Sequence, residues 1–369
     1  MGIINMVTHK IGKSEGVMNK KVVILVVLMG TVLTLFLKSN NKSEEISKTN
    51  QKNKLLTMNL EQTAGSGDYK TVTQSEWPTD GYKFNTELSR CENGSTLSWD
   101  DSKKAVVMNG NVSDKCYVYF DKVLTLANYV ISQYTGIQGE NSLYYHDSNL
   151  ANGVGDNSYR YAGASDSVNN YICLGSDAAT CPDDNLFRII GVFGAQTKVI
   201  RAKSVGNQKW DTSSSNKWSS SSLNTYLNGT YLTSLGTLKN KIATTTWKVG
   251  GGTPANISEV VPATAYKNEV GSSASRTIVN KKIGLMYVTD YYYSASPSAW
   301  TLVGYNSSDT TKDYRVAKTI NWLYLGSYEW TISCHSGTSY SAFGVGNLGY
   351  VSGYFDVSTS SAVRPTFNL

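Results

Sequence analysis

The feature that most constrains how this chain of 369 residues can fold is a run of sixteen uncharged residues near its start, at positions 22–37. As an α-helix at about 1.5 Å per residue, the run spans roughly 24 Å, the short end of what crosses a bilayer. We predict a single-pass signal anchor in the cell membrane that leaves residues 1–21 in the cytoplasm and places the C-terminal domain outside the cell. A cleaved signal peptide is the alternative, but no small-residue cleavage site follows the run.

The net charge of +6 arises from the residues on either side of this run. Residues 1–54 carry nine lysines and three glutamates, whereas the remaining residues carry 25 basic and 25 acidic side chains. The part that can form a core is therefore neutral, and it lacks the basic surface with which proteins bind nucleic acid. Residues 38–76 are rich in Lys, Asn, Ser and Thr, and we predict that they form a flexible stalk.

The five cysteines of an exported chain are expected to form disulfides where they can pair. Cys91 and Cys116 bracket 24 residues of alternating strands, and Cys173 and Cys181 bracket a loop of seven residues. We predict these two local disulfides, each stabilising the folded state by very roughly 2–3 kcal/mol. The fifth cysteine, Cys334, is predicted to fill the core as a small apolar side chain.

Short strands separated by turn residues predict a small all-β domain at 77–122, closed by the first disulfide. Apolar residues then recur at helical spacing, which predicts a helical linker at 123–140. Residues 141–369 alternate apolar strands with long polar loops, apart from one helix for which Ser222 is the expected N-cap. The predicted fold class is therefore α+β and β-rich.

The strands of this larger domain follow a recognisable order. "NNYICLGS" and "LFRIIGVF" are followed by "KIGLMYVTDY", "EWTIS" and a terminal "VRPTFNL". The pattern resembles uncharacterised surface proteins of Gram-positive gut bacteria whose C-terminal domain is C-type-lectin-like, a fold shared with formylglycine-generating-enzyme-like proteins. The resemblance implies a C-type-lectin-like domain at 141–369 whose long loops bind a ligand.

Three departures from that resemblance limit what it implies. The calcium-dependent sugar motifs of true lectins are missing, and no second cysteine lies close to Cys334 in the sequence. Asp183 and Asp184 are adjacent carboxylates, but a turn explains them better than a calcium site, which needs more oxygen ligands. We therefore predict neither a metal nor a cofactor.

Exposed aromatic rings are a common means of contacting sugars and flat protein surfaces. Such residues are concentrated in the last third of the chain, where three consecutive tyrosines are expected on a strand with at least one ring facing solvent. The candidate binding residues are Tyr291, Tyr292, Tyr293, Trp300, Tyr305, Trp322, Tyr324 and Tyr328.

Cys334 also admits a catalytic interpretation, because "TISC" followed by an arginine resembles the way a sortase presents its thiolate. A thiol nucleophile needs a base or cation that lowers its pKa. His335 would point to the opposite face of a strand, which leaves His146 and Arg364 as possible partners. For Arg364, a structural ion pair is the alternative.

The leading hypothesis is a non-enzymatic, membrane-anchored extracellular surface protein for adhesion or recognition of a glycan, a host protein or a cell-wall polymer. A surface cysteine enzyme, such as a sortase-like transpeptidase or a thiol oxidase using Cys334, is the alternative. A purely structural envelope protein is the third hypothesis.

Overall fold

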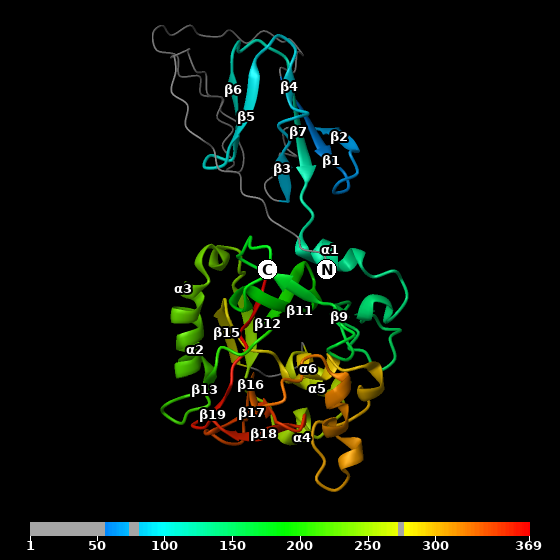
Figure 1. Cartoon of the computed structure of the whole chain (residues 1–369), viewed down its shortest axis with the longest axis vertical. Coiled ribbons are helices and arrows are strands. Elements are labelled where there is room, and N and C mark those ends of the chain that lie inside the picture. The colour runs from blue at the N-terminus through cyan, green and yellow to red at the C-terminus, as the bar shows by residue number, and fades with distance from the viewer. Residues whose placement is uncertain (1–55, 74–80, 272–276) are drawn as a thin grey trace. The chain divides into compact units, whose positions relative to one another are not determined.

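The computed structural model describes residues 56–73, 81–271 and 277–369, and the predicted anchor at 22–37 lies outside them. No helix within these three ranges is long and apolar enough to cross a membrane. The chain divides after Thr125 into two compact units, each described here by itself (Figure 1). Strands predominate and short helices are interspersed, as expected for a β-rich α+β protein.

The N-terminal unit is built from strands throughout its described part. These strands are β1 (Leu56–Glu61), β2 (Tyr69–Val72), β3 (Tyr82–Phe84), β4 (Arg90–Cys91), β5 (Thr96–Asp100), β6 (Ala105–Asn109) and β7 (Cys116–Lys122). One sheet has the order β2-β1-β7-β3 with β4 beside β7, and β5 pairs with β6 in a hairpin. Phe84, Val106, Val118 and Phe120 form its core together with apolar residues of β1.

The prediction of a stalk at 38–76 is wrong for residues 56–73, which begin with β1. β1 runs parallel to β7, and Met58 and Leu60 are buried against the same core as Val118. The six residues "LTMNLE" do alternate between apolar and polar side chains, as a half-buried strand requires. The signal was missed because it is short and follows a long polar tract.

Both predicted disulfides are confirmed. Cys91–Cys116 joins β4 to β7 at directly paired positions, and Cys173–Cys181 closes a loop of the C-terminal unit. The helix predicted in the linker is present as α1 (Leu126–Ser132) and belongs to the C-terminal unit.

Two sheets form the centre of the C-terminal unit. The strands are β8 (Leu143–Tyr145), β9 (Tyr159–Tyr161), β10 (Tyr171–Cys173), β11 (Leu186–Phe193), β12 (Gln196–Arg201), β13 (Asn207–Lys209), β14 (Thr245–Val249), β15 (Thr277–Lys281), β16 (Glu329–Cys334), β17 (Ser341–Val345), β18 (Val351–Asp356), β19 (Ser360–Ala362) and β20 (Thr366–Asn368). The first sheet has the order β20-β12-β11-β9-β8 with β10 beside β11, and the second has the order β13-β19-β16-β17-β18. β14 and β15 pair separately.

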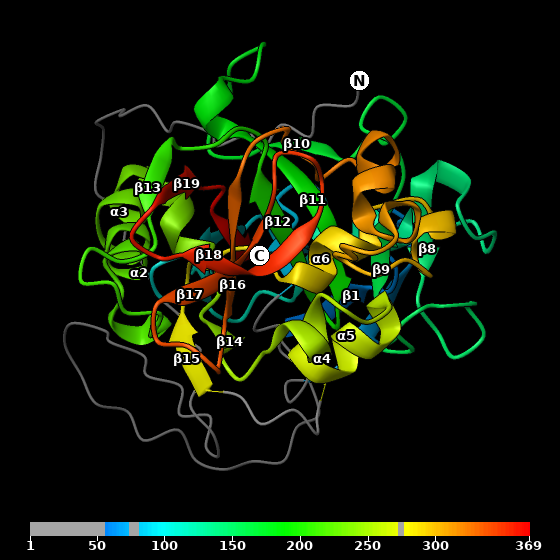
Figure 2. The same ribbon diagram turned by 90° about the horizontal axis from the view of Figure 1, so that it is seen from below.

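Short helices flank these sheets. They are α2 (Ser222–Tyr226), α3 (Leu232–Ser234), α4 (Pro254–Ile257), α5 (Pro262–Glu269) and α6 (Val288–Tyr293), and a π-helical turn, η5 (Leu227–Tyr231), connects α2 to α3. The 3-10 helices are η2 (Glu140–Ser142), η3 (Asp183–Asn185), η4 (Trp218–Ser220), η6 (Gly236–Asn240), η7 (Pro297–Ala299), η8 (Thr310–Lys312) and η9 (Tyr314–Ile320). Figures 1 and 2 place α2 and α3 on one side of the strands and α4, α5 and α6 on the other.

The helix predicted near Ser222 is confirmed, with its cap one residue earlier. The Ser221 hydroxyl accepts a hydrogen bond from the Asn224 N–H, as an N-cap does. Leu223 and Leu227 lie on the buried face, as helical spacing predicts.

The strand predicted for "KIGLMYVTDYYY", residues 282–293, is wrong: its first half makes only an isolated bridge at Gly284, and its second half forms α6 with all six side chains buried. A helix that is buried on every face shows no amphipathic period, so its apolar run resembles a core strand in the sequence.

Removal of the Cys91–Cys116 disulfide should destabilise the N-terminal unit selectively. The bond joins residues 25 apart, and closing such a loop contributes about 3 kcal/mol in the chain-entropy model. Replacing both cysteines with serine should lower the denaturant midpoint of that unit, followed by the fluorescence of Trp99, a residue packed against its core. An unchanged midpoint would contradict this prediction.

Candidate functional site

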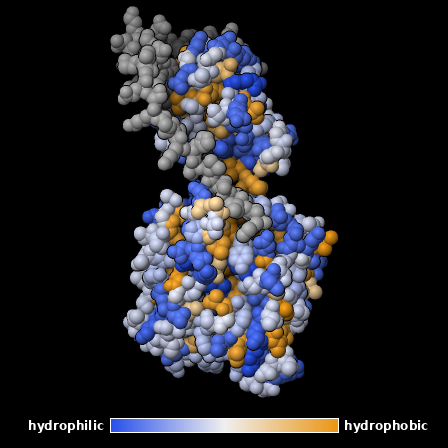
Figure 3. Space-filling view, in the orientation of Figure 1, coloured by the Kyte–Doolittle hydropathy of each residue, from blue (hydrophilic) through white to orange (hydrophobic). Residues whose placement is uncertain are grey.

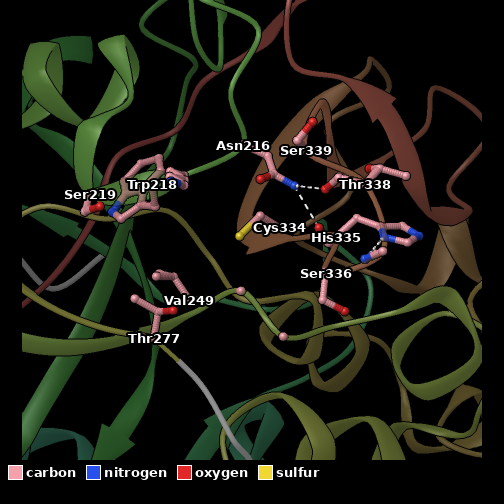
Figure 4. Close-up of a pocket in the computed structure, with 14 residues that line it drawn as sticks. Asn216, Trp218, Ser219, Val249, Thr277, Cys334, His335, Ser336, Thr338 and Ser339 are labelled. Atoms are coloured by element: carbon pink, nitrogen blue, oxygen red, sulfur yellow. Dashed lines mark hydrogen bonds between the residues drawn. The ribbon is translucent and has the colours of Figure 1, made fainter.

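A pocket of about 560 Å³ lies beside the loop that joins β16 to β17, and we call it the Cys334 pocket. Its walls come from three stretches: residues 216–219, residues 249–251 with Thr277, and residues 334–339. Figure 4 shows the side chains that line it. The lining includes hydroxyl groups, an indole ring and the Cys334 thiol.

Cys334 and His335 do not form a catalytic pair. Figure 4 shows their side chains pointing in opposite directions from the strand, as alternation predicts. Cys334 is 7% exposed, and a Cβ atom added to Gly250 would lie 3.2 Å from its Sγ, so the Gly250 backbone closes over the sulfur. His335 Nδ1 accepts a hydrogen bond from the Gly337 N–H, and burial lowers the pKa of this imidazole. The ring therefore bonds within its own loop and is turned away from the thiol.

His146 and Arg364 do not line the Cys334 pocket. His146 is buried between the rings of Tyr293 and Trp300, and burial lowers the pKa of its imidazole to about 2. Arg364 donates to both carboxylate oxygens of Glu329 at 2.6 and 2.8 Å, as its interpretation as a structural ion pair predicts. Glu329 and Cys334 occupy the two ends of β16, roughly 16 Å apart at the rise of a strand.

Asn216 holds the loop that forms one wall of the Cys334 pocket. Its side-chain nitrogen lies 2.7–2.8 Å from three carbonyl oxygens, those of His335, Thr338 and Ser341. Its backbone N–H donates to a fourth carbonyl, that of Ser339. One amide from a distant segment thus fixes the whole turn between β16 and β17.

Asp211 organises the segment that carries Asn216. Its carboxylate accepts hydrogen bonds from the N–H groups of Ser213, Ser215 and Ser222. Burial alone would raise the pKa of Asp211, but these N–H donors lower it below the usual value. The serine-rich tract is therefore an ordered wall of the pocket, which composition alone does not reveal.

Five of the eight predicted binding aromatics are buried, which corrects the predicted exposed platform. Three of them are the consecutive tyrosines of α6, which were expected on a strand. Each of their hydroxyls donates to a carbonyl in a different segment: Tyr291 to Gly349, Tyr292 to Ile257 at the end of α4 and Tyr293 to Asn152. The other two are Trp300 and Trp322, whose indole N–H groups donate to Ala295 and Tyr161.

The remaining three predicted aromatics reach the surface. Tyr305 is 37% and Tyr328 45% exposed, whereas Tyr324 is half-buried with its hydroxyl bonded to the Asn347 carbonyl. Tyr350 lies 5.5 Å from Tyr305, and Phe355 lies 5.5 Å from Tyr328, measured between ring centroids. The rings meet mostly edge to face, so they form a compact cluster rather than a flat platform.

A second pocket, of about 570 Å³, lies beside the Cys173–Cys181 disulfide, and we call it the Tyr171 pocket. Among the described residues that line it, none is Asp, Glu, Lys, Arg or His. Its polar groups are amides and hydroxyls from α1 and the residue after it, from η2, β9 and β10, and from the loops before and after β10. Asn169 is exposed, and its side chain has no hydrogen-bond partner in the part of the chain that the structure describes.

The ring of Tyr171 is held in place by Arg188, which packs against it. The Arg188 guanidinium lies 4.4 Å from its ring centroid and 4.5 Å from that of Trp322, so the cation is sandwiched between two rings. Arg188 is further fixed by hydrogen bonds to Asn170 and Val168. Tyr171 nevertheless remains 46% exposed, which makes it a rigid aromatic surface at the edge of the pocket.

The described residues contain no cluster of three or more His, Cys, Asp or Glu side chains that could hold a metal ion. Asp183 and Asp184 lie in the 3-10 turn η3, where they pair with Lys203 and Arg201 respectively. Figure 3 shows hydrophobic residues scattered in small groups over the visible face of the C-terminal unit. The candidate ligand sites in the described part of the C-terminal unit are therefore the Cys334 pocket, the Tyr171 pocket and the aromatic cluster of Tyr305, Tyr328, Tyr350 and Phe355.

Substitution of Asn216 by Ala should open the Cys334 pocket. The change removes the side-chain donor from the His335 and Thr338 carbonyls, while the Ser341 carbonyl keeps the His335 N–H, and this loss costs about 1–3 kcal/mol. In the folded wild type, Cys334 should react slowly with a maleimide, and in Asn216→Ala it should react many times faster. Asn169→Ala, an exposed amide in the other pocket, is the matched control. Rapid labelling of the wild type would instead show that the thiol is reachable.

Comparison with known families adds one match. Residues 195–369 match the model of a domain of unknown function, DUF6273. The matched region includes the Cys334 pocket and the cluster of Tyr305, Tyr328, Tyr350 and Phe355, whereas all residues that line the Tyr171 pocket precede it. Comparisons with curated proteins and with solved structures give no match.

Proposed function

We propose that this protein is a membrane-anchored surface protein that recognises an uncharged polar ligand outside the cell. The C-terminal unit takes a C-type-lectin-like fold in this proposal. The ligand class is a glycan, either on a host surface or in a cell-wall polymer. A segment of a host protein is the second ligand class to test.

The single observation that carries this proposal is the Tyr171 pocket. It is concave, its described lining is free of charged side chains, and it offers amides and hydroxyls beside a half-exposed ring. Sugars present hydroxyls for such groups and an apolar face for an aromatic ring. A charged ligand would find no ion-pair partner among these lining residues.

The rigidity of Tyr171 also favours recognition. Because Arg188 fixes its ring, little side-chain entropy is lost when a ligand stacks on it. The neighbouring Cys173–Cys181 disulfide restrains the loop that forms another wall of the pocket. A binding surface that is ordered beforehand needs fewer contacts for a given affinity.

The alternative of a surface cysteine enzyme rests on one observation, that Cys334 lines a pocket. Against it, the thiol is covered and neither His335 nor His146 is placed as its base. Maleimide labelling of Cys334 distinguishes this alternative from ligand recognition.

Replacing Tyr171 with Ala should weaken ligand binding at least tenfold, about 1.4 kcal/mol. The measurement is binding of residues 56–369 to an array of glycans and cell-wall fragments, with calcium and again with a chelator, followed by titration of any ligand found. Tyr354→Ala removes an even more exposed ring elsewhere in the unit and should leave the affinity unchanged. If no glycan or cell-wall fragment binds saturably, the proposed ligand class is refuted. If Tyr171→Ala and Tyr354→Ala lose the same affinity, the Tyr171 pocket is refuted as the binding site.

A further inference from the structure

One lysine of this protein is placed unlike the others. Among the described residues, Lys198 in β12 is the only lysine whose side chain is buried. Its Nζ lies 2.5 Å from Asp290 Oδ2 in α6, and the two side chains are 7% and 3% exposed. The residues are 92 positions apart in the chain, so this contact joins the first sheet to the buried helix.

The surroundings of Lys198 are aromatic. Its Nζ lies 4.4 Å from the ring centroid of Tyr287, 5.5 Å from that of Phe193 and 5.6 Å from that of Trp247. In the described part of the chain, the Asp290 carboxylate is its one hydrogen-bond acceptor. An ammonium group has three donors, so this buried cation is incompletely solvated by the protein.

The use of lysine here differs from the other buried ion pairs. Arg160 pairs with Asp156, and Arg364 pairs with Glu329. A guanidinium stays charged and offers a planar fork of donors, whereas a lysine that loses its proton becomes a nucleophilic amine. Burial lowers the pKa of Lys198, which favours that neutral amine.

We propose that Lys198 and Asp290 condense to form an intramolecular amide bond. The pair first exchanges a proton and becomes a neutral amine and a carboxylic acid. Lys198 Nζ then attacks Asp290 Cγ, the new C–N bond forms, and one C–O bond of the carboxyl breaks. The oxygen leaves with two protons as water, so the reaction requires no oxidant, reductant or other reactant.

The geometry favours the attack. Cγ is one bond beyond the oxygen that Nζ already contacts, which places it near the separation of about 3–3.5 Å typical of reacting atoms. The Tyr287 N–H donates to the same Oδ2 at 2.8 Å, so it can stabilise negative charge that develops on this oxygen. The product amide also replaces two buried charges with a neutral group, which removes their desolvation cost.

Glu269 acts as a positioning residue. It accepts hydrogen bonds from the N–H groups of Val288 and Thr289 at 2.9 Å, and also from the Ser333 hydroxyl. The backbone that immediately precedes Asp290 is thereby fixed with respect to β16. Loss of these bonds should slow condensation by displacing the carboxyl, without removing either reacting group.

The deciding experiment is the mass of the purified full chain after reduction and denaturation. The reduced protein should be lighter than its sequence by the mass of one water molecule. Digestion with a protease that does not cut at lysine should yield a branched peptide that contains both Lys198 and Asp290. An intact mass equal to that of the sequence, with no branched peptide, would overturn the proposal and leave an ordinary ion pair.

Matched variants test which residues form the bond. Lys198→Met and Asp290→Ala should each abolish the water loss, and Glu269→Gln should accumulate unlinked chain.

Lys203 and Asp183 form a control pair with the same 2.5 Å separation but with 63% and 62% exposed side chains. Lys203→Met should therefore retain the full water loss. Loss of water in Lys198→Met would place the dehydration elsewhere and refute the assignment. None of these outcomes depends on ligand recognition.

Discussion

A short helix without any exposed side chain, α6, is the constraint on which the C-terminal unit depends. Water cannot satisfy its polar groups, so the protein must supply every partner. Glu269 accepts from the first two N–H groups, and Lys198 pairs with Asp290. Because Lys198 belongs to one sheet and Glu269 also binds Ser333 of the other, the helix connects both sheets through buried polar contacts.

The three tyrosines of α6 extend this constraint to the loops. Their hydroxyls bind carbonyls near residues 152, 257 and 349, which belong to segments far apart in the sequence. A phenylalanine in place of Tyr291 or Tyr292 would pack as well but leave a buried carbonyl without its donor. The long polar loops of this unit are thus ordered from the inside, by side chains that do not reach the surface. The same logic explains Asn216, which satisfies several carbonyls of one turn.

Much of the fold could be predicted from local patterns. The two disulfides follow from cysteines that are close in the sequence, and the helix after Ser221 follows from a cap and an apolar face. The burial of Trp330 and Ile332 follows from alternation along β16. β1 was missed because six alternating residues are a weak signal at the end of a polar tract, and its partner, β7, lies about sixty residues away.

The candidate sites were harder to predict. Tyr171 occurs in a strand that the sequence does suggest. Its suitability as a rigid binding surface, however, depends on Arg188, which packs against its ring. The aromatic platform was expected at Tyr291, Tyr292 and Tyr293 because a row of rings on a strand must expose some of them. On a helix whose side chains are all buried none of them is exposed, and their hydroxyls instead hold distant segments in place.

The sequence by itself determined the elements whose cause is local: the disulfides, the capped helix, the alternating strands and the neutrality of the part that folds. Only the tertiary structure decided which polar residues are buried together, because Lys198, Glu269, Asp290 and Ser333 come from four separate elements. Such contacts depend on how sheets and helices pack, and no spacing along the chain encodes them. The two pockets likewise exist only where distant segments meet.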